Sequence, residues 1–187
     1  MSNETGVQAP LHSLIPLEDF KAVLGLDDRD DTLSRYCLIT ATYSIEQYCK
    51  RRLLRKKHTD YLTFMGEHIF ALREYPIRRI LAVWAATAGA VQQGEPLFTP
   101  ENMVDPKHYF CLPDEGIQED IPFSLVLRPP LRLSRGEMGI RVRYLAGYVP
   151  GKAPADLASA CLELAAWNMS RYRGRRIGMT GNVRGSG

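Results

Sequence analysis

The stretch TLSRYCLITATYSIEQYCKRRLL, residues 32–54, has the clearest helical pattern in the chain. Its apolar and small residues recur at steps of three and four, which places them on one face of an α-helix. We therefore predict a helix from about residue 31 to 52, with Asp30 or Asp31 available to cap its free N–H groups. The predicted buried stripe consists of Leu33, Cys37, Ala41, Ile45 and Tyr48.

A basic run, KRRLLRKK at residues 50–57, follows the end of this pattern. Positive side chains are favourable at the negative end of a helix dipole, so the run suits a solvated helix end with aliphatic stems packed beneath it. It also suits a charged oligomer interface or a surface that faces DNA. The candidate residues of this surface are Lys50, Arg51, Arg52, Arg55, Lys56 and Lys57.

Upstream of the long helix, residues 1–13 are polar and without a pattern, and we predict a flexible N-terminal arm over residues 1–15. The segment IPLEDFKAVLGL then predicts a short helix that starts near Pro16 and ends at Gly25. The following DDRDD, residues 27–31, lacks the spaced ligands and the central glycine of a calcium loop. We interpret it as a turn and helix cap.

Residues 58–148 change to the pattern of β-strands. Short segments rich in β-branched and aromatic residues are separated by Gly, Pro and acidic loops such as QQGEPLFTPENMVDPK and DEGIQED. In GIRVRYLAGY, Ile140, Val142 and Tyr144 alternate with more polar positions, which indicates a strand with one buried face.

Helical spacing resumes in APADLASACLELAAWNMSRYRG, where Pro154 suits the start and Gly174 the end. The expected inner stripe is Leu157, Cys161, Leu164, Asn168 and Tyr172. The glycine-rich remainder, residues 175–187, predicts a flexible basic tail.

These segments predict an α+β fold in which N-terminal and C-terminal helices, at about 16–54 and 154–173, pack together around a β-rich insertion at about 58–148. At 187 residues the chain is long enough for one core, so we expect a single domain over residues 16–174.

The net charge of +3 is unevenly distributed along the chain. No acidic residue follows Glu163, and the five arginines after it outweigh a charge of −2 in everything before. The basic character therefore belongs to the C-terminus and not to a whole face of the fold. Guanidinium groups in the segment RYRGRR suit recognition of carboxylate or phosphate groups.

Several classes of function lack their motifs in this sequence. There is no HExxH, GxSxG, P-loop or GxGxxG pattern, so we expect neither an enzyme nor a bound cofactor or metal. The four cysteines are far apart without a CxxC pair, which favours free thiols. No signal peptide or membrane span is apparent, and we expect a soluble, intracellular protein.

The order of these elements resembles that of the head-tail connector proteins, also called adaptor or head-completion proteins, of tailed bacteriophages and prophages. FKAVLGLDDRDDTLSRYCLITATYSIEQYCKRRLL resembles the family's opening, which ends in a phrase like IExYxxRxL, although Lys50 stands where the family commonly has glycine. EYPIRRILAV resembles a family strand, and VRYLAGYVPGKAPADLASACLELAAWNMSRYRG resembles its closing strand, turn and helix, with a less aromatic helix end at residues 168–170.

The resemblance implies a non-enzymatic virion protein at the head–tail junction, made in the bacterial host cytoplasm. Its copies would form a ring, a dodecamer in the family, that docks on the portal protein, extends the DNA channel and meets a downstream neck or tail protein. It implies no membrane partner and leaves room for non-specific contact with channel DNA. We expect portal docking by Arg171, Tyr172, Arg173, Arg175, Arg176 and Arg184.

Two alternatives stay open at this stage. One is a small DNA-binding protein that uses the basic clusters at 50–57 and 171–176 together, although the arginines gather at helix ends and not along one helix face. The other is an enzyme whose site is assembled from distant loops.

Overall fold

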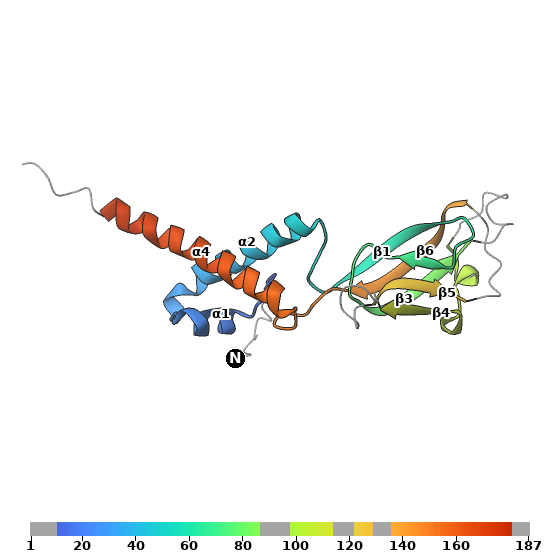
Figure 1. The fold of residues 1–187 in the computed structure, drawn as a ribbon, viewed down its shortest axis with the longest axis horizontal. Helices are drawn as coiled ribbons and strands as arrows, with labels where there is room; N and C mark the ends of the chain where they lie inside the picture. Colours follow the sequence, from blue (N-terminus) through green and yellow to red (C-terminus); the bar gives the residue numbers. More distant parts are fainter. Residues whose placement is uncertain (1–10, 87–97, 114–121, 129–135, 181–187) are drawn as a thin grey trace, which may run out of the picture. The chain divides into compact units, whose positions relative to one another are not determined.

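The chain divides into two compact units, which are described separately. The helical unit contains residues 1–50 and 149–187, and the β unit contains residues 51–148 (Figure 1). The predicted α+β class, with helices at both ends and strands between them, is confirmed. The single domain expected over residues 16–174 stays a prediction.

The structure is a computed structural model that describes residues 11–86, 98–113, 122–128 and 136–180. Within these ranges, the backbone alone is described for residues 113, 122–123, 136–138 and 175–180. The N-terminal arm up to residue 10, the acidic loop DEGIQED and the last seven residues lie outside the described part.

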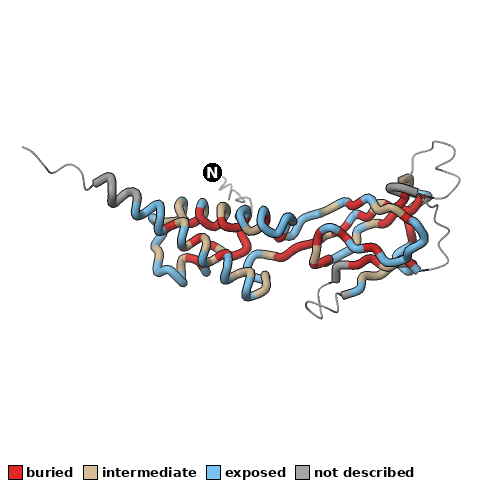
Figure 2. The backbone as a smooth tube through the Cα atoms, turned by 45° about the horizontal axis from the view of Figure 1, so that its top comes forward, coloured by how far each residue is buried: buried red, intermediate tan, exposed pale blue. Residues whose placement is uncertain are grey.

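The helical unit consists of α1 (Leu17–Leu24), the short 3-10 turn η1 (Asp28–Asp30), α2 (Asp31–Cys49) and α4 (Ala155–Thr180). Both α1 and α4 pack against α2, and the buried side of the three helices is red in Figure 2. A fully buried Leu or Phe side chain stabilises such a unit by about 2 kcal/mol. The fully buried apolar residues are Leu14, Phe20, Cys37, Leu38, Ala41, Cys161 and Ala165.

Helix α1 begins and ends where the sequence predicted. Pro16 precedes its first residue, and Gly25 follows its last with φ of 62°, a left-handed conformation that costs glycine little. The acidic turn after it is held by side chains: the Asp27 carboxylate accepts the N–H of Arg29 at 2.9 Å, and Lys21 donates to Asp28 and Asp31. These hydrogen bonds raise the pKa of Lys21 above its ordinary value.

Helix α2 ends earlier than predicted, at Cys49 instead of residue 52. Lys50 adopts the left-handed conformation, with φ of 53°, and its N–H returns to the carbonyls of Glu46 and Gln47. A left-handed residue cannot continue a right-handed helix, so the chain leaves the helical unit here. The position therefore has the geometry that favours glycine, although lysine occupies it.

Helix α4 passes through Gly174, the predicted end, and continues to Thr180. Gly174 is absent from the glycines with positive φ, and a Cβ added to it would meet nothing within 4 Å. Glycine in a helix interior costs about 1 kcal/mol relative to alanine, which the rest of a long helix tolerates. The predicted helix end at Gly174 is thus wrong, and the flexibility of residues 175–187 stays a prediction.

The described part of the β unit contains two three-stranded antiparallel sheets. The first has the order β1-β6-β3, and the second has the order β2-β5-β4. Two 3-10 turns, η2 (Pro100–Asn102) and η3 (Pro106–His108), precede β4. The strands are β1 (Lys56–Phe64), β2 (Ile69–Ala71), β3 (Ile77–Ala85), β4 (Tyr109–Pro113), β5 (Pro122–Leu127) and β6 (Gly136–Ala146).

The two sheets share one apolar core. The predicted alternation in β6 is confirmed, since Ile140, Val142 and Tyr144 are buried, whereas Arg143 is exposed. Side chains of both sheets meet these residues, among them Leu125 of β5. The core therefore forms between the sheets, as in other packed pairs of antiparallel sheets.

Two chain segments run side by side where the β unit begins and ends. Tyr148 donates its N–H to the carbonyl of Leu53 at 2.7 Å, and Arg55 donates to the carbonyl of Tyr148 at 2.8 Å. Gly147 between them has φ of 101°, and a Cβ there would lie 2.7 Å from the Leu53 carbonyl oxygen. A glycine is thus required at position 147 for both conformational and steric reasons.

We predict opposite effects for two glycine substitutions. Gly147→Ala should destabilise the β unit by about 2–4 kcal/mol because it combines a left-handed backbone with a backbone clash. Gly174→Ala should stabilise the helical unit by about 0.5–1 kcal/mol because it removes the helical cost of glycine.

Urea denaturation followed by tryptophan fluorescence measures both effects. The chain has two tryptophans, Trp84 in the β unit and Trp167 in the helical unit. A Trp167→Phe background makes Trp84 report on the β unit, and a Trp84→Phe background makes Trp167 report on the helical unit. An unchanged urea midpoint for Gly147→Ala would contradict the close approach of Gly147 to the Leu53 carbonyl.

Lys50→Gly should stabilise the helical unit by about 0.5–1 kcal/mol, because the left-handed conformation costs a non-glycine residue about 1–2 kcal/mol and the greater freedom of unfolded glycine offsets part of that gain. Lys50→Ala is the matched control, since it removes the charge without relieving the backbone. If both variants gave the same melting temperature, the left-handed cap would not be the cause.

Candidate functional site

The basic run at residues 50–57 is divided among a helix cap, a connecting segment and a strand, and it does not form the end of a helix. Lys50 caps α2, residues 51–55 belong to the β unit, and Lys56 and Lys57 begin β1. The prediction that this run forms the end of the helix is wrong. The left-handed Lys50 ends α2, and residues 51–57 lie beyond the helix.

Arg51 and Arg52 make contacts inside the β unit. The Arg51 guanidinium donates to the Tyr75 carbonyl at 2.7 Å and lies 3.6 Å from the centre of the Tyr75 ring. The Arg52 N–H donates to the Glu74 carboxylate at 3.0 Å. Hydrogen bonds and ring stacking of this kind fix the start of the unit, so Arg51 is a structural residue and not an exposed basic group.

Arg55, Lys56 and Lys57 are exposed. Lys56 and Lys57 pair with Ala146 and Leu145 of β6, and successive side chains of a strand point to opposite faces. Lys56 and Lys57 therefore point to opposite faces of β1, and the DNA-facing surface at residues 50–57 stays a prediction.

The arginines of α4 have different environments from one another. The Arg171 guanidinium lies 4.7 Å from the centre of the Trp167 ring, and both side chains are exposed. The Tyr172 ring meets the edge of the Tyr36 ring of α2, with 5.7 Å between the ring centres. Tyr172 thus contributes to packing between the two helices, while Arg171 lies on the outside.

Arg173 is engaged within the helical unit. Its guanidinium lies 2.6 Å from the carboxylate of Asp30, and the two side chains are 47% and 26% exposed. Asp30 occupies the N-cap position of α2 without capping it, so the predicted cap is replaced by this ion pair. A partly exposed pair of this kind contributes at most about 1 kcal/mol to the stability of the unit. It nevertheless pairs the positive charge of Arg173 with a carboxylate of the same chain.

Arg175 and Arg176 belong to the last turns of α4, where the backbone alone is described. Residues four apart in a helix share a face, so the backbone puts positions 171 and 175 on one face. Arg184 lies outside the described residues.

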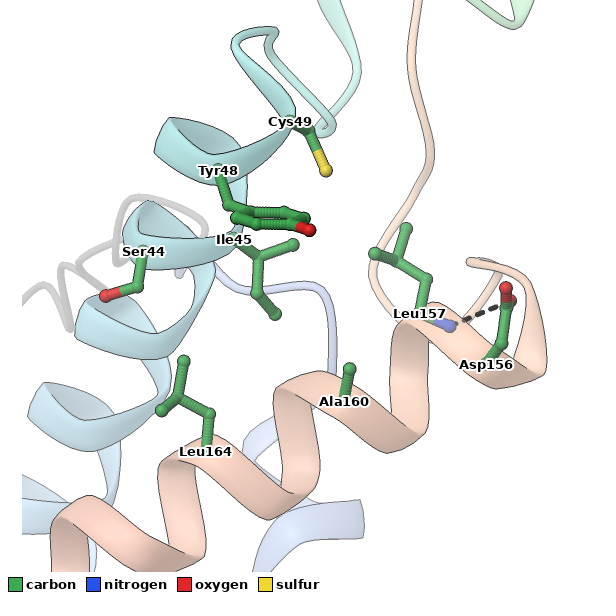
Figure 3. Close-up of a pocket in the computed structure, with 8 residues that line it drawn as sticks. All are labelled: Ser44, Ile45, Tyr48, Cys49, Asp156, Leu157, Ala160 and Leu164. Atoms are coloured by element: carbon green, nitrogen blue, oxygen red, sulfur yellow. Dashed lines mark hydrogen bonds between the residues drawn. The ribbon is translucent and has the colours of Figure 1, made fainter.

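The sequence did not predict an apolar groove between the second half of α2 and the first half of α4. Its volume is about 460 Å³. Figure 3 shows Ile45 of α2 and Leu157 and Leu164 of α4 directed toward the space between the helices. The lining residues are Ser44, Ile45, Tyr48, Cys49, Asp156, Leu157, Ala160 and Leu164.

The sequence did contain a signal for this groove. Ile45 and Tyr48 continue the α2 stripe that Cys37 and Ala41 begin, yet Ala41 is fully buried and Tyr48 is 89% exposed. Helices α2 and α4 meet where the Thr42 hydroxyl lies 3.6 Å from the Cys161 sulfur. The prediction that Tyr48 is buried is wrong, because nothing in the described part of the chain covers the stripe beyond that meeting point.

A buried polar cluster in the β unit is the strongest candidate for proton chemistry. The Tyr144 hydroxyl donates to the Asp60 carboxylate at 2.8 Å and accepts the N–H of Glu74 at 3.1 Å, and the same Asp60 oxygen accepts the N–H of Arg73. Burial and the bond to Asp60 raise the pKa of Tyr144, and burial lowers that of His58 beside it. Both groups therefore stay neutral near pH 7, and the cluster satisfies backbone groups.

Other classes of site are not apparent in the described residues. No three His, Cys, Asp or Glu side chains there are grouped as a metal ion would require. No described helix combines the length and hydropathy that a membrane crossing needs. The predicted free thiols are confirmed: Cys37 and Cys161 are buried, Cys111 is partly buried, and Cys49 is exposed at the groove.

Comparison with known proteins gives a likeness of fold. No protein-family model matches the chain, and no curated protein matches it. Among solved structures, a chain from the neck of a native gene transfer agent particle, computed with C12 symmetry, has a TM-score of 0.54 and 18% identity. That match covers 97% of this chain and 85% of the other.

A second match is a chain from the neck of an empty gene transfer agent particle, computed with C6 symmetry, with a TM-score of 0.56 and 18% identity. It covers 93% of this chain and 81% of the other. At this identity the comparison establishes the fold, which this chain shares over nearly its whole length with a chain from the neck of a phage-like particle.

Proposed function

We propose that the chain is a structural subunit of the neck of a phage-like particle, and not an enzyme. In this role its copies form a ring that docks on the portal, extends the DNA channel and joins the head to a downstream neck or tail protein. The observation that carries the proposal is the likeness, over 97% of the chain, to a neck chain. The resemblance of the sequence to connector proteins points to the same role.

The number of copies in the ring is part of the proposal. One of the similar necks was computed with C12 symmetry, and twelve copies agree with the connector resemblance. Cyclic rings require head-to-tail contacts, in which two different surfaces of the same chain meet. The protein would then be made in the host cytoplasm and end at the head–tail junction of the particle.

We assign portal docking to the outer arginines of α4 and the segment beyond it. Arg171 is exposed, Arg175 follows it on the same helical face, and Arg176 and Arg184 extend the basic character. Arg173 holds Asp30, so its part in docking is to anchor α4. Repeated around a ring, weak ion pairs with an acidic portal surface add to a strong total affinity.

The proposal is tested by mixing the full-length protein with the portal of its own particle and viewing the complex by electron microscopy. We expect rings on the portal with wild-type protein and at least a tenfold loss of docking with Arg171→Ala, Arg175→Ala and Arg176→Ala combined. The matched control combines Arg55→Ala, Lys56→Ala and Lys57→Ala, which removes three exposed charges from the β unit and should leave docking unchanged.

Two results would contradict this proposal. If wild-type protein bound duplex DNA tightly and never associated with the portal, the neck role would be wrong. If both triple variants lost docking equally, net charge and not the α4 arginines would be responsible, and the assignment of these residues would fail.

A further inference from the structure

The groove between α2 and α4 lacks a covering segment within the described part of the helical unit. Ile45 and Tyr48 on one side and Leu157, Ala160 and Leu164 on the other leave apolar surface in water. Apolar surface in a shaped groove between helices is the usual receptor for aliphatic side chains of another helix.

The α1 corner of the same unit presents exposed aliphatic side chains. We use this name for the exposed surface of α1, which carries Val23 and Leu24, 63% and 37% exposed, in its last turn and the exposed Glu18 and Asp19 in its first turn. The corner is held in place, since Phe20 is fully buried beneath it. Such preorganised aliphatic side chains bind with little loss of conformational entropy.

The charges around the two surfaces are opposite. Lys50 and Lys152 are exposed; Lys50 directly follows Cys49, and Lys152 lies four residues before Asp156 in the segment that leads into α4. Asp156 is the single carboxylate that lines the groove, and it accepts the N–H of Leu157 at 2.8 Å. The acidic residues of the α1 corner are thus opposite in charge to two lysines that neighbour lining residues of the groove in sequence, which favours this orientation.

The groove and the α1 corner lie at opposite ends of α2. Lys21 of α1 bonds Asp31, the first residue of α2, whereas the groove begins at Ser44. At 1.5 Å per residue these points are about 20 Å apart along the helix. Two surfaces so separated cannot meet in a single copy, and between copies they would make the head-to-tail contact that a cyclic ring requires.

We propose that the groove between α2 and α4 receives the α1 corner of a second copy of the chain, with Val23 and Leu24 seated against Ile45, Leu157 and Leu164. This inference rests on the ring that we propose above and names the surfaces by which neighbouring copies meet. It also assigns the exposed stripe of α2, including Tyr48, to the contact between copies and not to the portal.

The native thiol of Cys49 provides a direct test, because Cys49 is the one exposed cysteine in the described part of the chain and it lines the groove. Rings of the full-length Val23→Cys variant, assembled on the portal, are oxidised mildly and analysed by non-reducing electrophoresis and mass spectrometry. We expect a disulfide between position 23 of one copy and Cys49 of the next, and a ladder of covalent oligomers beyond the dimer.

Four controls identify the linkage. Oxidised wild-type protein and the Val23→Cys, Cys49→Ser double variant should lack this linked peptide. Thr59→Cys places a thiol at another exposed, β-branched position, in the β unit, and should not link to Cys49. Co-assembly of wild-type protein with the double variant should stop at linked dimers, because each copy then carries one of the two thiols.

A steric variant tests the same contact without oxidation. Ala160→Trp fills the groove and should reduce ring formation at least tenfold, whereas Ser159→Trp, on the exposed side of the same turn, should not. Circular dichroism verifies that both variants fold, and if Ala160→Trp did not, the disulfide experiment would decide alone.

The outcomes separate this inference from the proposed function. Rings that form without the position 23 to Cys49 disulfide would overturn the inference and leave the neck role intact. A disulfide from Cys49 to the portal would likewise overturn it. If wild-type protein formed no ring on the portal, the proposed function would fall and this contact with it.

Discussion

The helical unit depends on a single hydroxyl group in the middle of α2. Thr42 is fully buried, its oxygen accepts the N–H of Leu14 at 3.2 Å, and it lies 3.6 Å from the sulfur of Cys161. The N-terminal segment, α2 and α4 therefore meet at one point. Two helices that cross at a fixed point separate on both sides of it. On one side the contact of Tyr36 with Tyr172 closes the gap and α1 packs against α2, and on the other side the gap remains the groove.

The β unit is organised by a second buried oxygen, that of Tyr144 in the central strand β6. Its bonds to Asp60 of β1 and to the N–H of Glu74 join the first sheet to the loop before β3. A buried polar group without partners costs about 1–3 kcal/mol, so this cluster specifies the register of β6 as well as stabilising it. The cluster resembles a catalytic arrangement in composition, but its hydrogen bonds are used for structure.

Much of the fold could be predicted from the sequence, because helices and strands with one buried face repeat their apolar residues at fixed steps. The alternation of β6 and the start of α2 followed from this rule. The end of α2 did not, because Lys50 adopts a conformation that glycine normally supplies, and Gly174 failed as a stop because its φ is helical. The groove was missed for another reason. Periodicity places Tyr48 on the apolar face of α2, but it does not say whether another part of the same chain covers that face.

The close pairing of Leu53 and Arg55 with Tyr148 has a consequence for the order of folding. The β unit is continuous in sequence, whereas the helical unit is divided into two parts by 51–148. During synthesis α2 is complete long before α4 exists. The apolar stripe of α2 that α4 later covers is therefore exposed to solvent until α4 has been made. The entropic cost of joining two distant segments rises with the length of the loop between them. Once the β unit has folded, its two ends are held together. The loop that must close when α4 packs against α2 is then short, and the entropic cost of closing it is small.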